Sequence, residues 1–206
     1  MMKKLNTYNV CFLGTTGFGK STLINALFHT KFDTDPVSAC TKELYSVTMI
    51  GDFPKGKNAL TIYDTPGIGE FSINTPYQKY YEHVINIADC VVLVLTFDRI
   101  DSPSLKLLNC LQPFLDKRRK TKFIIALNKI DSKATGEKVD VAWDRENNKP
   151  SEKWMDYIDI KINDIKSVYR QGRIDYCIDD FLPYEIIPVC AKRNYGLEKL
   201  KNKIIS

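Results

Sequence analysis

The chain has 206 residues, of which 44% are hydrophobic and 27% charged, and its formal net charge is +5. This length and composition suit one globular domain with a substantial core and exclude a chain that is disordered throughout. Six scattered cysteines without a Cys-x-x-Cys pair, and only two histidines, argue against a zinc site or a disulfide framework and predict a reducing, cytoplasmic setting. The polar N-terminus is not a signal peptide, and no apolar run approaches the ~18 residues that cross a bilayer.

Strands and helices are predicted to alternate along the chain. The predicted strands are residues 8–13, 43–50, 58–63, 90–97, 123–128 and 185–190. The predicted helices are residues 21–28, 76–88, 102–117, 151–169 and 197–205. This order indicates one α/β domain over residues 1–206, in which helices cover both faces of a mainly parallel sheet and a polar insertion loop occupies about 132–150. Ligands of such sheets bind beyond the carboxyl ends of the strands.

A phosphate-binding loop is predicted directly after the first strand, because residues 14–21 read Gly-Thr-Thr-Gly-Phe-Gly-Lys-Ser and match GxxxxGK[ST] in full. Glycines let backbone N–H groups turn toward phosphates, and the helix that follows adds the positive end of its dipole. The Lys20 side chain can reach the β- and γ-phosphates, and the Ser21 hydroxyl suits Mg²⁺. The candidate nucleotide-binding residues of this loop are Gly14, Thr16, Gly17, Phe18, Gly19, Lys20, Ser21 and Thr22.

A magnesium-binding carboxylate is predicted at Asp64, where the third strand ends in Asp-Thr-Pro-Gly. The Gly67 N–H is a candidate donor to a γ-phosphate. The loop at 30–42 offers Thr34, Ser38 and Thr41 as a hydroxyl ligand, and we favour Thr41 because it lies just before the next strand. Ser21, Thr41 and Asp64 are then the candidate metal ligands, and Lys20, Thr41 and Gly67 the candidate catalytic residues.

A guanine pocket is predicted where the fifth and sixth strands end. The Asp131 carboxylate can accept from guanine N1–H and the N2 amino group, whereas adenine lacks that pair of donors. Asn128 can join two loops by hydrogen bonds, and the stem of Lys129 can cover one face of the base. Cys190-Ala191-Lys192 closes the last predicted strand, and the Ala191 N–H is a candidate donor to guanine O6.

These stretches, in this order, resemble the motif set of translation-factor-class GTPases, and their spacing is similar to the Era-like branch of small bacterial G domains. The phosphate loop continued as Thr-Leu-Ile-Asn-Ala-Leu, then Cys-Thr-Lys-Glu, Asp-Thr-Pro-Gly-Ile-Gly-Glu and residues 143–151, resembles bacterial GTPases catalogued as ribosome-binding. Immunity-related dynamin-like GTPases share some of these features. The resemblance implies a three-layer Ras-like fold with one antiparallel edge strand, GTP and GDP with Mg²⁺ as ligands, and a hydrolysis-driven switch at residues 30–43 and 64–80.

Two functions of different classes remain open at this stage. Ile68 stands where Ras-like proteins place the glutamine that orients the attacking water, and no arginine lies in either switch segment. A GTPase that is slow alone and stimulated by a partner or a second protomer is one interpretation, and a nucleotide sensor with negligible turnover is the other. The basic run 117–122 could contact ribosomal RNA or could be a solvated helix end.

Overall fold

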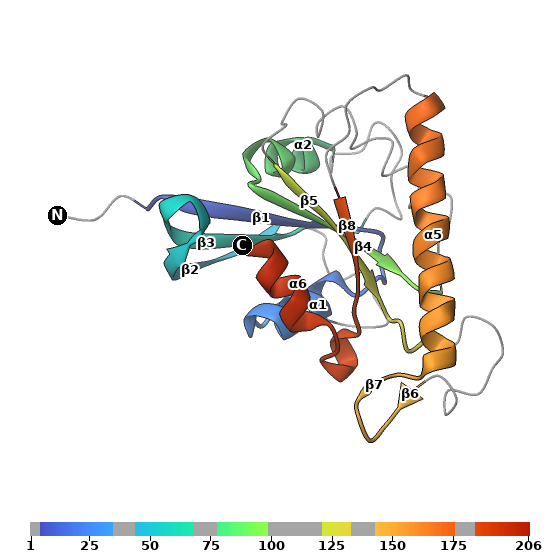
Figure 1. Cartoon of the computed structure of the whole chain (residues 1–206). Coiled ribbons are helices and arrows are strands. Elements are labelled where there is room, and N and C mark those ends of the chain that lie inside the picture. The colour runs from blue at the N-terminus through green and yellow to red at the C-terminus, as the bar shows by residue number, and fades with distance from the viewer. Residues whose placement is uncertain (1–4, 35–43, 68–77, 99–120, 133–142, 176–183) are drawn as a thin grey trace.

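The protein is built around a six-stranded sheet in the order β2-β3-β1-β4-β5-β8 (Figure 1). This computed structural model describes residues 5–34, 44–67, 78–98, 121–132, 143–175 and 184–206. The strands are β1 (Thr7–Leu13), β2 (Tyr45–Phe53), β3 (Lys57–Asp64), β4 (Cys90–Thr96), β5 (Lys122–Asn128) and β8 (Tyr184–Pro188). β2 runs antiparallel to β3 and the other neighbours are parallel, which confirms the predicted mostly parallel sheet with one antiparallel edge strand.

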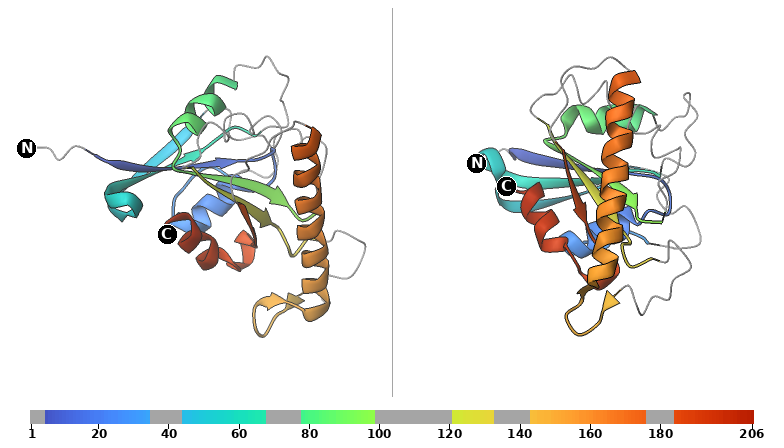
Figure 2. Two further views of the ribbon diagram at one scale, coloured as in Figure 1. Left: turned by 45° about the horizontal axis from the view of Figure 1, so that its top comes forward. Right: turned by 45° about the vertical axis from the view of Figure 1, so that its right-hand side comes forward.

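Helices cover both faces of this sheet. They are α1 (Lys20–Phe28), α2 (Gln78–Ile87), α5 (Glu152–Asp175) and α6 (Leu197–Ile204). α1 and α6 lie together on one face and α2 lies on the other, as Figure 2 shows. α5 runs beside the carboxyl ends of β4 and β5, where the rings of Trp154 and Phe97 lie 5.4 Å apart. The helix predicted at 102–117 falls outside the described residues, and within the described parts of the chain no helix has the length and apolar character to cross a membrane.

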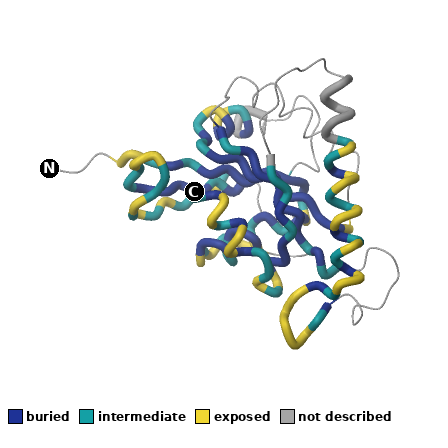
Figure 3. Tube along the Cα trace, in the orientation of Figure 1, coloured by how far each residue is buried: buried dark blue, intermediate teal, exposed yellow. Residues whose placement is uncertain are grey.

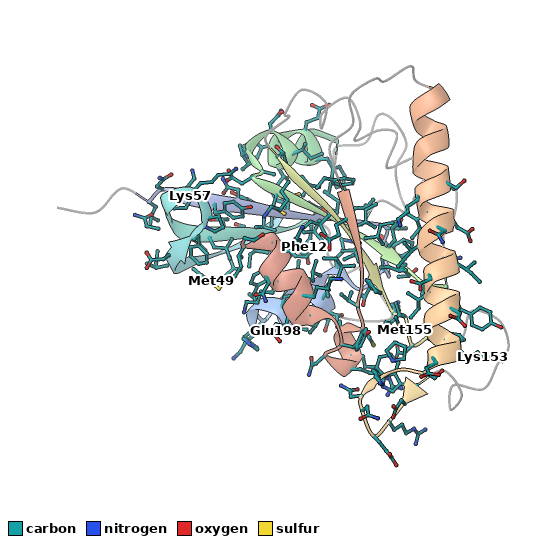
Figure 4. The ribbon with its side chains drawn as sticks, viewed as in Figure 1. Phe12, Met49, Lys57, Lys153, Met155 and Glu198 are labelled. Atoms are coloured by element: carbon teal, nitrogen blue, oxygen red, sulfur yellow. The ribbon has the colours of Figure 1, made fainter. Side chains whose placement is uncertain are left out.

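The core follows the central strands. Every residue of β4 is buried, and all of β5 except its first residue (Figure 3). Such continuous apolar runs are expected of strands that have neighbours on both sides and helices on both faces. On α5, Met155 lies on the side facing the sheet and Lys153 on the outer side (Figure 4). Because β1, β3, β5 and β8 run in the same direction, their carboxyl ends lie along one edge of the sheet.

Two boundaries differ from the predictions by more than two residues. β2 continues to Phe53, so the turn before β3 shortens to Pro54–Gly56. α5 extends to Asp175, beyond the predicted end at Tyr169. A single internal glycine at 172 costs a helix only about 1 kcal/mol, which is too little to end it.

The predicted insertion loop is corrected more substantially. Its described part contains two short paired strands, β6 (Trp143–Asp144) and β7 (Lys149–Pro150), and we call residues 143–150 the insertion hairpin. Trp143 is only 4% exposed and meets the ring of Tyr195 edge to face at 5.5 Å. Because this segment is polar overall, its composition did not indicate that Trp143 packs against the domain and holds the segment in place.

Candidate functional site

The glycine-rich loop joins β1 to α1 and leaves the start of that helix without a side-chain cap. Gly19 precedes α1 with a φ of 81°, a left-handed conformation that glycine adopts without strain. A Cβ there would lie 2.9 Å from Asn128 Nδ2, so a side chain would also crowd the neighbouring loop. Uncapped N–H groups at a helix N-terminus form an anion site. The predicted phosphate loop therefore has the local geometry that the motif requires.

Lys20 is the first residue of α1, and its side chain is buried against this loop, with 6% of its surface exposed. Its Nζ donates to the backbone oxygen of Gly14 at 3.0 Å and to that of Thr15 at 3.4 Å. Burial lowers the pKa of the Lys20 ammonium to about 8, while the nearby Asp64 charge opposes that change. The loop thus holds a buried cationic group whose charge is costly without an anionic ligand.

Ser21 and Asp64 meet although they are distant in sequence. The Ser21 hydroxyl donates to Asp64 Oδ2 at 2.5 Å. Asp64 is 1% exposed, and its Oδ1 has no hydrogen-bond partner among the described residues. Burial raises the pKa of this carboxyl, and the Ser21 hydrogen bond and the Lys20 charge lower it. The Ser21 hydroxyl, beside a buried carboxylate with one oxygen left to bind, fits the oxygen ligands that Mg²⁺ prefers. The third predicted ligand, Thr41, falls outside the described residues.

Gly67 packs directly against the phosphate loop. A Cβ at this position would lie 2.0 Å from Thr16 Oγ1 and 2.6 Å from Thr16 N, so no side chain fits there. The segment that carries Gly67 is held from both sides: the Thr65 hydroxyl donates to Phe12 O at 2.8 Å, and the Tyr81 hydroxyl donates to Pro66 O. These contacts set the Gly67 backbone next to the loop that would hold the phosphates.

Asn128 joins three loops at the end of β5. Its Nδ2 donates to Phe18 O at 3.1 Å, and its Oδ1 accepts from Ala191 N at 3.3 Å. The next residue, Lys129, donates from Nζ to Gly17 O at 2.7 Å, so its stem lies along the phosphate loop. Phosphate loop, β5 end and β8 end consequently form one connected surface.

Asp131 sits in this surface with partners that sequence reasoning missed. Its Oδ2 accepts from Arg193 Nε at 2.8 Å. Burial, together with the neighbouring Asp131 carboxylate, raises the pKa of the Cys190 thiol to about 12. Arg193 directly follows the predicted Cys190-Ala191-Lys192 stretch, which is the one sequence signal that could have suggested it. Lys192 is exposed, as is Thr22 on the first turn of α1.

A family model described as "50S ribosome-binding GTPase" matches residues 9–129, which is more than half of the chain. Septin-9 of Rattus norvegicus is 31% identical over 105 residues, which cover 42% of this chain and 19% of the septin. GTPase Era of Campylobacter jejuni is 29% identical over 124 residues, which cover 59% of this chain and 39% of Era. The aligned segments therefore span well under half of either relative.

Solved structures confirm the fold. A dimerization-deficient mutant of Toc33 from Arabidopsis thaliana superposes with a TM-score of 0.62 at 16% identity, covering 97% of this chain and 83% of that one. A variant of SsGBP gives a TM-score of 0.52 at 18% identity, covering 97% and 54%. At such identities the likeness concerns architecture alone. With the family match spanning the phosphate loop, Asp64 and Asn128, the chain belongs to the GTPase family described as 50S ribosome-binding GTPases.

Proposed function

We propose that this chain binds GTP and GDP with Mg²⁺ and hydrolyses GTP as a molecular switch that is slow alone and stimulated by a partner or a second protomer. The observation that supports this most directly is the connected surface at the ends of β1, β3, β5 and β8. There a glycine loop with a buried lysine lies beside a buried carboxylate and beside Asp131. Each group matches a different part of a guanine nucleotide.

In this proposal Lys20 and the backbone N–H groups at the start of α1 bind the phosphates, and Ser21 and Asp64 hold Mg²⁺, which supplies positive charge at the β- and γ-phosphates. Lys20 leaves the carbonyl groups of Gly14 and Thr15 to meet the anionic ligand. The charge that develops in the transition state is then stabilised by fixed groups rather than by water. Thr41 would add a hydroxyl ligand in the presence of a γ-phosphate.

The missing part is a group that orients the attacking water. Ile68 follows Gly67 and cannot donate or accept a hydrogen bond through its side chain. A partner or a second protomer would supply this group. An arginine supplied in trans can raise the rate of GTP hydrolysis by roughly 10³ to 10⁵. The same observation supports the second candidate, a nucleotide sensor or assembly module with negligible hydrolysis.

Turnover over a range of protein concentrations separates these functions. GTP conversion to GDP is followed by chromatography with Mg²⁺, with Lys20→Ala as background. A rate per molecule that rises with concentration supports activation by self-association, and a flat, slow rate supports a GTPase that awaits a partner, such as a ribosome or a protein effector. GTP that is bound but not converted above background favours the sensor. GTP that is not bound at all refutes the proposal.

Base recognition is tested at Asp131. Asp131→Asn replaces an acceptor by a donor, so we expect weaker GTP binding, by about 10- to 100-fold, and stronger binding of xanthosine triphosphate. Titration calorimetry with both nucleotides measures this exchange. Unchanged GTP affinity in the variant would remove Asp131 from the base pocket.

A further inference from the structure

The insertion hairpin contacts Arg193, the residue that forms the ion pair with Asp131. The Arg193 guanidinium carbon lies 4.8 Å from the centre of the Trp143 ring, a stacking contact. The Arg193 backbone oxygen accepts from Asn148 Nδ2 at 2.9 Å. The hairpin therefore contacts both the side chain and the backbone of Arg193, in addition to the contact that Arg193 makes with Asp131.

Hydrogen bonds within the insertion hairpin stabilise its conformation. Trp143 Nε1 donates to Asn148 Oδ1 at 3.3 Å, which connects the two residues that hold Arg193. At its turn, the Asp144 carboxylate accepts from Asn147 Nδ2 at 2.7 Å and from the backbone N–H groups of Asn147 and Glu146, each at 3.1 Å, and these bonds lower its pKa. A rigid turn and a buried Trp143 give Arg193 a fixed support rather than a mobile one.

The backbone around Asp131 is fixed from another direction. Trp154 Nε1 on α5 donates to Ile130 O at 2.6 Å, and Ser132 N donates to Lys129 O at 2.9 Å. What remains free is rotation of the Asp131 side chain. The Arg193 contact restricts that rotation.

The acceptor capacity of the carboxylate then limits what it can bind. An ionised carboxylate offers about four lone-pair sites. Arg193 uses one of them, and the remaining sites can accept from guanine N1–H and from one N–H of its 2-amino group. Hypoxanthine, the base of inosine nucleotides, presents only the N1 donor. A hydrogen bond from the 2-amino group adds more to the binding free energy when the carboxylate is held in one orientation than when it rotates freely.

We propose that Arg193, held by the insertion hairpin, is a positioning residue that orients the Asp131 carboxylate and so sets the preference for guanine over hypoxanthine. This inference rests on the proposed guanine-binding role of Asp131. Arg193 keeps its place when the base enters, because its support comes from Trp143 and Asn148, outside the base pocket. A segment beyond residues 9–129, the part matched by the family, thereby contributes to nucleotide choice.

The test is titration calorimetry of the full chain with GDP, IDP and ADP in the presence of Mg²⁺. For Arg193→Ala we expect GDP affinity to fall about tenfold and IDP affinity about threefold, so that the preference for GDP shrinks, because a hydrogen bond to a charged group is lost. Arg193→Lys keeps the charge but lacks the planar N–H geometry, so it should restore only part of the preference. Asn148→Ala, which touches no part of Asp131, should shift the preference in the same direction by about twofold.

The control is Lys199→Ala, which removes one exposed positive charge on α6 and should leave all three affinities unchanged. A higher GDP affinity in Arg193→Ala would mean that Arg193 competes with the base, which overturns the inference. Equal losses for GDP and IDP would mean a merely structural role and overturn it too, as would no change. Wild-type protein that binds no GDP would refute the proposed function itself, whereas wild-type binding with an unaltered Arg193→Ala refutes only the inference.

Discussion

Replacing Lys20 by methionine should stabilise the nucleotide-free protein while it abolishes nucleotide binding. Methionine keeps an unbranched stem of similar length and removes the buried charge. Burial lowers the Lys20 pKa from 10.5 to about 8, and at about 1.4 kcal/mol per pH unit this difference corresponds to about 3 kcal/mol. The variant also loses the hydrogen bonds to Gly14 O and Thr15 O, and each loss lowers the stability by about 1 kcal/mol. A net gain of about 1–2 kcal/mol remains, or roughly 3–6 °C in Tm for a chain of this size.

The pH dependence of this effect follows from the direction of the pKa change. Below pH 8 Lys20 is protonated in the folded and unfolded states, and the full cost of burying the charge is present. Between pH 8 and 10.5 the unfolded chain binds more protons than the folded one, so wild-type stability rises with pH and the advantage of Lys20→Met disappears. With saturating GDP and Mg²⁺ the order reverses, because a ligand at 100 times its Kd adds about 2.7 kcal/mol to the wild type alone.

Thermal melts at pH 7 and pH 10, with and without GDP, measure these terms. Lys199→Met on the exposed face of α6 is the matched control and should melt like the wild type at both pH values. A Lys20→Met variant that melts below the wild type at pH 7 without nucleotide would refute the idea that the buried charge is a cost. A difference in Tm that is the same at both pH values would refute the assignment of that cost to Lys20.

Two further substitutions probe the junctions of the site. Gly67→Ala should lower the GTP turnover rate by about tenfold or more and leave GDP binding nearly intact, because its Cβ would meet Thr16 at 2.0 Å and push the Gly67 backbone away from the phosphate loop; single-turnover assays measure this, and unchanged turnover would count against a role for the Gly67 N–H. Asn128→Ala should reduce the free energy of unfolding by about 2–3 kcal/mol, because it leaves Phe18 O and Ala191 N without their buried partner. Urea denaturation of Asn128→Ala measures this change. A decrease in the free energy of unfolding of less than about 0.5 kcal/mol would show that other contacts hold the Phe18 and Ala191 loops together.

The sequence predicted the sheet because its strands are either continuously apolar, as in β4 and β5, or end in a recognisable motif. The same patterns located Asp64 and Asn128 at strand ends and Lys20 at the start of the helix that follows β1, and parallel topology brings these places together. The pairing of Arg193 with Asp131 could not be predicted, because it joins residues 62 positions apart through side-chain geometry that leaves no periodic signal. The insertion hairpin was missed for a related reason: a single buried Trp143 does not alter the polar average of its segment.

Asn128 bonds to residues 110 positions before it and 63 positions after it, at Phe18 and Ala191. Phe18 is synthesised before Asn128 and Ala191 after it, so the proposed base pocket cannot close until Ala191 has been made. An interrupted translation product, or a proteolytic fragment that stops at the end of β5, would carry the phosphate loop without the Ala191 strut. If the proposed function holds, such a fragment should be retained less well on a nucleotide column than the 206-residue chain.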